Sequence, residues 1–68
     1  MDGTEFIWRV KRYARKTGQK CRYNPRHGKG SHGRLHLGDR LTTVPRKEIG
    51  KGLLAAMLKD LGIDKEEF

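Results

Sequence analysis

The chain has 68 residues, and its 16 Lys and Arg against 8 Asp and Glu give a formal net charge of +8. A chain of this length forms one domain, residues 1–68, with a thin core, because it buries only about 60% of its unfolded surface. The charge predicts a polyanionic or acidic partner, with nucleic acid as the first candidate. Cys21 is the only cysteine, which excludes an internal disulfide, and no apolar run has the length of a membrane span or a signal peptide. We therefore expect a cytoplasmic protein without membrane association.

The first predicted element is a helix over residues 2–16. Asp2 and Glu5 have the spacing of a capping box at its start, and Gly18 is suited to end it. An apolar stripe with three- and four-residue spacing is formed by Phe6, Val10, Tyr13 and Ala14. One helix face is therefore expected to pack and the other to be cationic. Trp8 falls near the edge of the stripe, where we expect partial packing, with aromatic stacking as the alternative.

Three short strands are predicted over residues 19–24, 32–37 and 40–44. A two-residue turn that contains glycine joins the second and third strands as an antiparallel hairpin. In the second strand polar and apolar residues alternate, so Leu35 and Leu37 must face the core. The same parity places Arg34, His36 and His32 together on the opposite face.

The last predicted element is a helix over residues 51–62, with Gly62 as its terminator. Its apolar face, expected to be the main contribution to the core, consists of Leu53, Leu54, Met57, Leu58 and Leu61. The polar tail over residues 64–68 is expected to fray. The element order α-β-β-β-α predicts an α+β two-layer sandwich, in which both helices cover one face of a three-stranded antiparallel sheet and leave the other free.

The loop before the second strand carries the residues that are best suited to catalysis. Three glycines in six residues let the backbone approach a ligand closely, and Lys29 and Arg34 add positive charge beside them. His32 is the nearby side chain that can take and give a proton near neutral pH. This combination predicts chemistry on a phosphodiester.

Cleavage of RNA at such a site needs a base for the 2′-hydroxyl proton and positive charge for the developing phosphorane. His32 suits the first task, and Lys29 and Arg34 are candidates for the second. A 2′,3′-cyclic phosphate product would follow. The two cations are equally suited to holding phosphates without a part in the chemistry.

Three stretches together resemble the HicA-type messenger-RNA interferase toxins: Lys29-Gly30-Ser31-His32, residues 33–45 and residues 48–63. The resemblance covers nearly the whole chain. It implies a fold like the double-stranded-RNA-binding domain and a metal-independent endoribonuclease that cuts mRNA, from a type II toxin–antitoxin pair with a HicB-type antitoxin. It also implies that His32 is the catalytic residue. The residues expected around it, for RNA binding or for the shape of the loop, are Lys29, Gly30, Ser31 and Arg34.

The chain departs from the pattern of the family at two positions. Many members carry an aromatic residue or a second histidine where this chain has Gly33, and a further histidine where it has Arg46. His36 lies too far along the strand to take over the role of a second histidine.

Two other classes of function remain open at this point. A basic module that binds RNA without cutting it would need the same charge, and a module that docks an acidic protein partner would need it too. No metal or cofactor is expected. A metal set could nominally be assembled from Cys21, His27, His32 and His36, but this spacing matches no paired-ligand motif.

Overall fold

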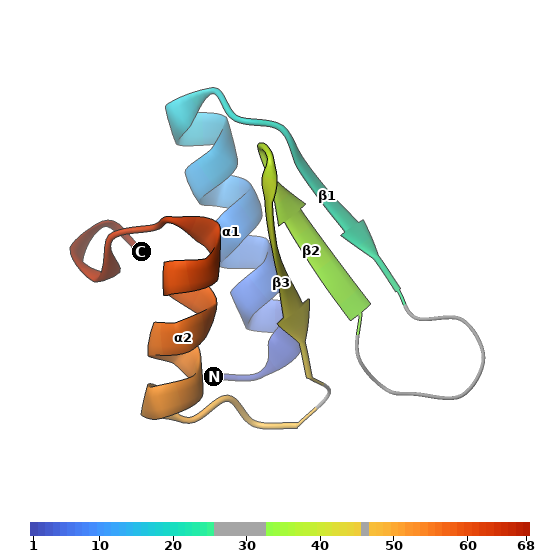
Figure 1. Cartoon of the computed structure of the whole chain (residues 1–68), viewed down its shortest axis with the longest axis vertical. Coiled ribbons are helices and arrows are strands. Elements are labelled where there is room, and N and C mark those ends of the chain that lie inside the picture. The colour runs from blue at the N-terminus through green and yellow to red at the C-terminus, as the bar shows by residue number, and fades with distance from the viewer. Residues whose placement is uncertain (26–32, 46) are drawn as a thin grey trace.

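The computed structural model describes residues 1–25, 33–45 and 47–68, and Figure 1 shows two helices on one side of a sheet. In chain order, the elements among these residues are helix α1 (Gly3–Thr17), strands β1 (Cys21–Asn24), β2 (Gly33–Leu37) and β3 (Arg40–Val44), helix α2 (Lys51–Leu61) and the 3₁₀-helix η1 (Lys65–Glu67). The strands are antiparallel, with β2 between β1 and β3. The predicted α+β fold is therefore confirmed, whereas its likeness to a double-stranded-RNA-binding domain stays a prediction.

Helix α1 begins at the predicted cap. The Asp2 carboxylate accepts a hydrogen bond of 2.8 Å from the backbone N–H of Glu5, and Gly18 ends the helix with a φ of 72°. That left-handed conformation costs other residues about 1 kcal/mol or more, which explains the glycine. The inward face of the helix consists of Phe6, Val10 and Ala14, all buried. The stripe identified in the sequence is thus the face that covers the sheet.

Strands β2 and β3 form a hairpin whose register decides which side chains are buried. Leu37 pairs with Arg40 across a two-residue turn, and Gly38 opens this turn with a φ of 61°. Glycine at this position is typical of a type II′ turn, whose twist matches that of the strands. Leu35 pairs with Thr42, so both face the helices and both are buried.

The buried hydroxyl of Thr42 is satisfied from α2. It donates a hydrogen bond of 3.0 Å to a carboxylate oxygen of Asp60. A buried hydroxyl without a partner costs free energy, so this bond favours one placement of α2 on β3.

Helix α2 buries a narrower stripe than predicted. Met57, Leu58 and Leu61 are almost fully buried, whereas Leu54 is only partly buried and Leu53 keeps 39% of its surface exposed. At 100° per residue Leu53 falls at the margin of the buried stripe, and that margin faces solvent because α2 packs mainly against β3. The prediction that Leu53 belongs to the core is therefore wrong.

The tail is ordered rather than frayed. It forms η1, and the ring of Phe68 packs against Phe6 with 5.4 Å between the ring centroids. The guanidinium of Arg9 lies 4.5 Å from the centroid of the Phe68 ring and donates a hydrogen bond of 2.7 Å to the backbone oxygen of Phe68. The prediction of a frayed tail overlooked this aromatic anchor on the core.

Trp8 lies farther from the core than predicted. Its side chain is 60% exposed, because the buried stripe of α1 is centred on Phe6, Val10 and Ala14 and Trp8 falls outside it. The structure therefore places Trp8 mainly in solvent, and it is not among the side chains that pack against the core.

Gly3, in the first turn of α1, tests the packing of this helix on the sheet, and Gly52, in the first turn of α2, is the control. A Cβ on Gly3 would lie 2.8 Å from the backbone oxygen of Pro45 and 3.1 Å from a methyl carbon of Val44, whereas a Cβ on Gly52 would meet nothing within 4 Å. We expect Gly3→Ala to lower the free energy of unfolding by about 1–3 kcal/mol through overpacking. Gly52→Ala should raise it by about 0.5–1 kcal/mol. Urea unfolding followed by circular dichroism measures both, and effects of the same sign would contradict the close contact of α1 with the end of β3.

Candidate nucleic-acid interface

The predicted site residues fall into two groups. Arg34 lies in β2, exposed, on the face of the sheet opposite the helices. Outside the described residues lie Lys29, Gly30, Ser31 and His32, together with His27 and Arg46. The described residues on either side of the main gap are Pro25, just after β1, and Gly33, the first residue of β2. The prediction that His32 shares a face with Arg34 therefore stays a prediction.

The sheet face opposite the helices is polar and is called the open face below. By strand register it consists of Arg22, Asn24, Arg34, His36, Leu41 and Thr43. Arg34 pairs with Asn24 of β1 and Thr43 of β3, and His36 pairs with Arg22. Arg22 and His36 face each other directly across the strands, at about 5 Å between Cβ atoms, and Arg34 lies two residues along β2 on the same face, so the two arginines and the histidine form one group. The shared face predicted for Arg34 and His36 is confirmed.

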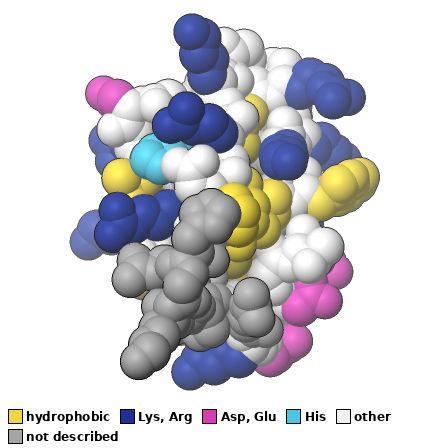
Figure 2. Space-filling view, turned by 90° about the vertical axis from the view of Figure 1, so that its right-hand side faces the viewer, with side chains coloured by type: hydrophobic (Ala, Val, Ile, Leu, Met, Phe, Trp, Pro, Cys, Tyr) yellow, Lys and Arg dark blue, Asp and Glu magenta, His cyan; other side chains and the backbone are white. Residues whose placement is uncertain are grey.

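Positive charge dominates this side of the molecule. Figure 2 shows basic side chains spread over it and around a histidine. Among the described residues, the ion pairs join the Met1 ammonium to Glu48 and Arg9 to Glu5, so Arg22 and Arg34 have no carboxylate partner there. Exposed guanidinium groups without an internal partner are available to phosphates, which they bind with two parallel hydrogen bonds.

A shallow hollow lies at the end of the sheet where β1 begins and the hairpin of β2 and β3 turns, next to the open face. It is lined by Lys20, Cys21, Arg22, His36 and Gly38. His36 is half-buried there, while Arg22 beside it is exposed. A half-buried imidazole beside an arginine can hydrogen-bond a phosphate or a ribose hydroxyl, so this hollow extends the surface on which a nucleotide can rest.

Cys21 does not have the environment of a nucleophile. Burial raises the pKa of its thiol, and the nearby charge of Lys11 only partly opposes this. The thiol form therefore predominates near neutral pH. Cys21 pairs with Leu37 on the helix-covered face, whereas His36 belongs to the open face, so these two members of the nominal metal set lie on opposite sides of the sheet.

Tyr23 supports the start of β2 in a way that sequence reasoning did not anticipate. A Cβ on Gly33 would lie 2.2 Å from the Tyr23 hydroxyl, which means that the phenol occupies the space of a side chain at position 33. Glycine is required there for this close approach. The absence of a side chain at position 33, which departs from the family pattern, is thus matched by the ring of Tyr23.

Arg22 is the other residue that sequence reasoning missed as part of this surface. The alternation of Cys21 and Tyr23 with Lys20 and Arg22 already places the two cations on one face of their strand. That face could not be joined to Arg34, because the connection between β1 and β2 is too long to specify a register.

A comparison with known protein families assigns the chain to a family. The family model described as "HicA toxin of bacterial toxin-antitoxin" matches residues 9–63. This chain belongs to the HicA toxin family. The matched part of this HicA chain runs from α1 through the sheet and α2. The HicA protein is accordingly the toxin of a toxin–antitoxin pair and has a cognate antitoxin.

Other comparisons add nothing to this assignment. No curated protein and no solved structure matches the HicA chain significantly. Within the part of the chain that the structure describes, no helix combines the length and the apolar character needed to cross a bilayer.

The raised pKa of Cys21 predicts how its reactivity depends on pH. Because only the thiolate is alkylated, we expect the rate of reaction with iodoacetamide to rise at a higher pH in the native protein than in the same chain unfolded in urea. Folding favours the protonated thiol, so this contribution to stability is present below the ordinary thiol pKa and declines as the pH rises through the folded value. A native midpoint at or below the unfolded one would contradict the buried environment.

Proposed function

We propose that this HicA chain is an endoribonuclease that cuts mRNA without a metal ion, with His32 as its catalytic residue. Family membership supports a toxin, and the motif Lys29-Gly30-Ser31-His32 supplies the residue that the family resemblance implies. The observation that carries the proposal is the open face. It brings the guanidinium groups of Arg22 and Arg34, which have no carboxylate partner among the described residues, onto an uncovered, basic surface of the strands that flank this motif.

The proposed reaction uses the 2′-hydroxyl of the RNA as an internal nucleophile. His32 takes the proton from this hydroxyl, a bond forms between the 2′-oxygen and phosphorus, and the bond to the 5′-oxygen breaks. The 5′-oxygen leaves as a hydroxyl after it gains a proton from water, and the other product carries a 2′,3′-cyclic phosphate. Arg34 and Lys29 offset the negative charge that builds up on the phosphorane.

Gly30 and Ser31 have supporting roles in this proposal. Gly30 has no Cβ, so the backbone around it can approach the phosphate closely. The hydroxyl of Ser31 can donate a hydrogen bond to a phosphate oxygen. Both residues act on the shape of the loop and on RNA binding rather than on proton transfer.

The antitoxin in this proposal is a HicB-type protein that covers the open face in the cytoplasm. A surface with two exposed arginines calls for acidic or other complementary groups on the partner, which would exclude RNA from the same place. The affinity of the antitoxin, measured directly by calorimetry, should therefore fall when Arg22 and Arg34 are replaced by glutamine.

The decisive experiment compares wild-type protein with His32→Ala and His36→Ala on a long single-stranded RNA in EDTA. We expect His32→Ala to lose activity by about 10²–10⁴-fold, the range for loss of a general base. His36→Ala removes an imidazole from the open face and is the control: because His36 is proposed only to contact RNA and not to move a proton, its loss should cost far less activity than the loss of His32. Products should carry 2′,3′-cyclic phosphate ends.

Each outcome has a distinct meaning once circular dichroism shows that the variants are folded. If wild-type protein binds RNA but leaves it intact, the protein is a binding module and the ribonuclease proposal fails. If all three proteins cut equally, another residue is catalytic. Products with 5′-phosphate ends would exclude attack by the 2′-hydroxyl.

Arg34→Gln tests the charge on the open face. We expect it to lower kcat/KM by tenfold or more and to weaken RNA binding, because it removes a cation close to the proposed reaction centre. The matched control is Lys59→Gln, an exposed cation on α2 that belongs to the other layer of the fold. Equal effects of the two substitutions would mean that only net charge matters.

A further inference from the structure

The outer face of α1 has a feature that the proposed ribonuclease site leaves unexplained. Trp8 is the only tryptophan of the chain, and its side chain is 60% exposed. A large aromatic ring is usually buried or placed at an interface, because its apolar surface is costly to leave in water. Trp8 therefore marks this face as a candidate contact surface.

Arginines accompany the exposed ring. The guanidinium carbon of Arg12 lies 5.7 Å from the centroid of the Trp8 ring, within the range of a cation–π contact. Arg15 follows at the next helical repeat, so Trp8, Arg12 and Arg15 share one face of α1. Apart from the pairs of Met1 and Arg9, no ion pair is found among the described residues, so both arginines lack a carboxylate partner there.

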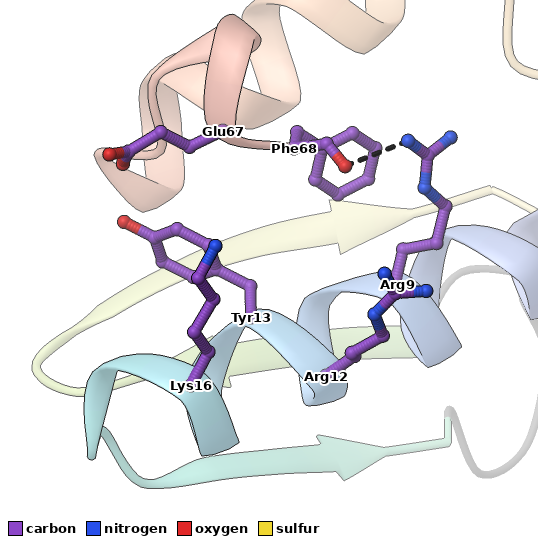
Figure 3. Close-up of a pocket in the computed structure, with 6 residues that line it drawn as sticks. All are labelled: Arg9, Arg12, Tyr13, Lys16, Glu67 and Phe68. Carbon is purple, nitrogen blue, oxygen red and sulfur yellow. Dashed lines mark hydrogen bonds between the residues drawn. The ribbon is translucent and has the colours of Figure 1, made fainter.

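More positive charge lies next to this face. A cavity of about 110 Å³ between α1 and the tail is lined by Arg9, Arg12, Tyr13, Lys16, Glu67 and Phe68. Figure 3 shows that Arg9 reaches Phe68, whereas Arg12 and Lys16 make no such hydrogen bond among the residues drawn. Arg9 is thus a structural cation, and the cations free to bind an anion are those nearer the outside of α1.

The combination favours a nucleic-acid strand over an acidic protein. An acidic peptide would be satisfied by the cations alone and would not require an exposed ring. Single-stranded RNA offers both phosphates for arginine and bases that stack on an aromatic side chain. Stacking does not require a particular base, because every base has a flat π surface.

We propose that the outer face of α1 is a second contact for single-stranded RNA, in which Trp8 stacks on a base and Arg12 and Arg15 hold the neighbouring phosphates. This face lies on the far side of α1 from the sheet and is separate from the open face. The proposal rests on the proposed function only in the choice of RNA among nucleic acids, and it does not require that the RNA be cut.

The single tryptophan makes a direct test available. The full chain is titrated with a 2′-O-methyl oligoribonucleotide, which cannot be cleaved through its 2′-oxygen, and Trp8 fluorescence is followed. We expect saturable quenching, because a stacked base changes the excited state of the indole. Polyglutamate of equal charge is the matched probe without bases, and it should leave the fluorescence unchanged.

Variants separate stacking from charge. Trp8→Leu keeps an apolar side chain but cannot stack, and we expect it to weaken binding of a labelled oligonucleotide about tenfold, or about 1.4 kcal/mol. Arg12→Gln and Arg15→Gln should each reduce the slope of log affinity against log salt by about 0.7. Lys59→Gln, on α2, should have a smaller effect on both measurements than any of these variants.

The outcomes also separate this proposal from the ribonuclease proposal. The contact on α1 is refuted if the oligonucleotide binds without quenching and Trp8→Leu binds like the wild type. Equal quenching by polyglutamate would assign the face to an acidic protein partner and also refute the proposal. Quenching that persists in a chain that cuts no RNA would support the contact while the ribonuclease proposal fails, and His32→Ala should quench like the wild type.

Discussion

The structure depends on the burial of Leu35 and Leu37 against the helices. Both side chains are almost fully buried, and because strand residues alternate, their burial forces Arg34 and His36 to the other face. A shift of one residue would bury an arginine without a partner, at a large cost in free energy. The hydrophobic contact of β2 with the helices therefore determines where the charges of the proposed RNA surface lie.

A thin core has a functional consequence for so basic a chain. Two helices suffice to cover one face of the sheet, and the residues left over must face water on the other face or on the outside of the helices. The cations of this HicA chain consequently lie on both sides of the core, with Arg22 and Arg34 on the open face and Arg12 and Arg15 on α1. A flexible polyanion can follow such a surface around the molecule, whereas a compact acidic protein can cover only one side of it. Inhibition by an antitoxin then requires only that the proposed reaction centre be blocked.

The sequence predicted those elements whose signals are local. The cap at Asp2, the terminators Gly18 and Gly62 and the two-residue turn at Gly38 were all found where expected, because each depends on a few neighbouring residues. The error over the tail concerns a contact between distant segments. The contact of Phe68 with Phe6 joins residues far apart in the chain, and no local sequence pattern predicts it. For the site, the shared face of Arg34 and His36 followed from parity, whereas His32 lies outside the described residues and its role rests on the family.

The sequence by itself determined the element order, the inward side of each regular element and the family, because periodicity, capping residues and motif spacing are properties of short stretches. Only the tertiary structure decided which strands are neighbours and how wide each buried face is. It paired Arg22 with His36, placed the ring of Tyr23 over Gly33 and left Trp8 exposed beside Arg12. These contacts depend on the register of the strands and on how the helices pack against the sheet. The free energy that favours this arrangement comes from the whole core and not from any one segment.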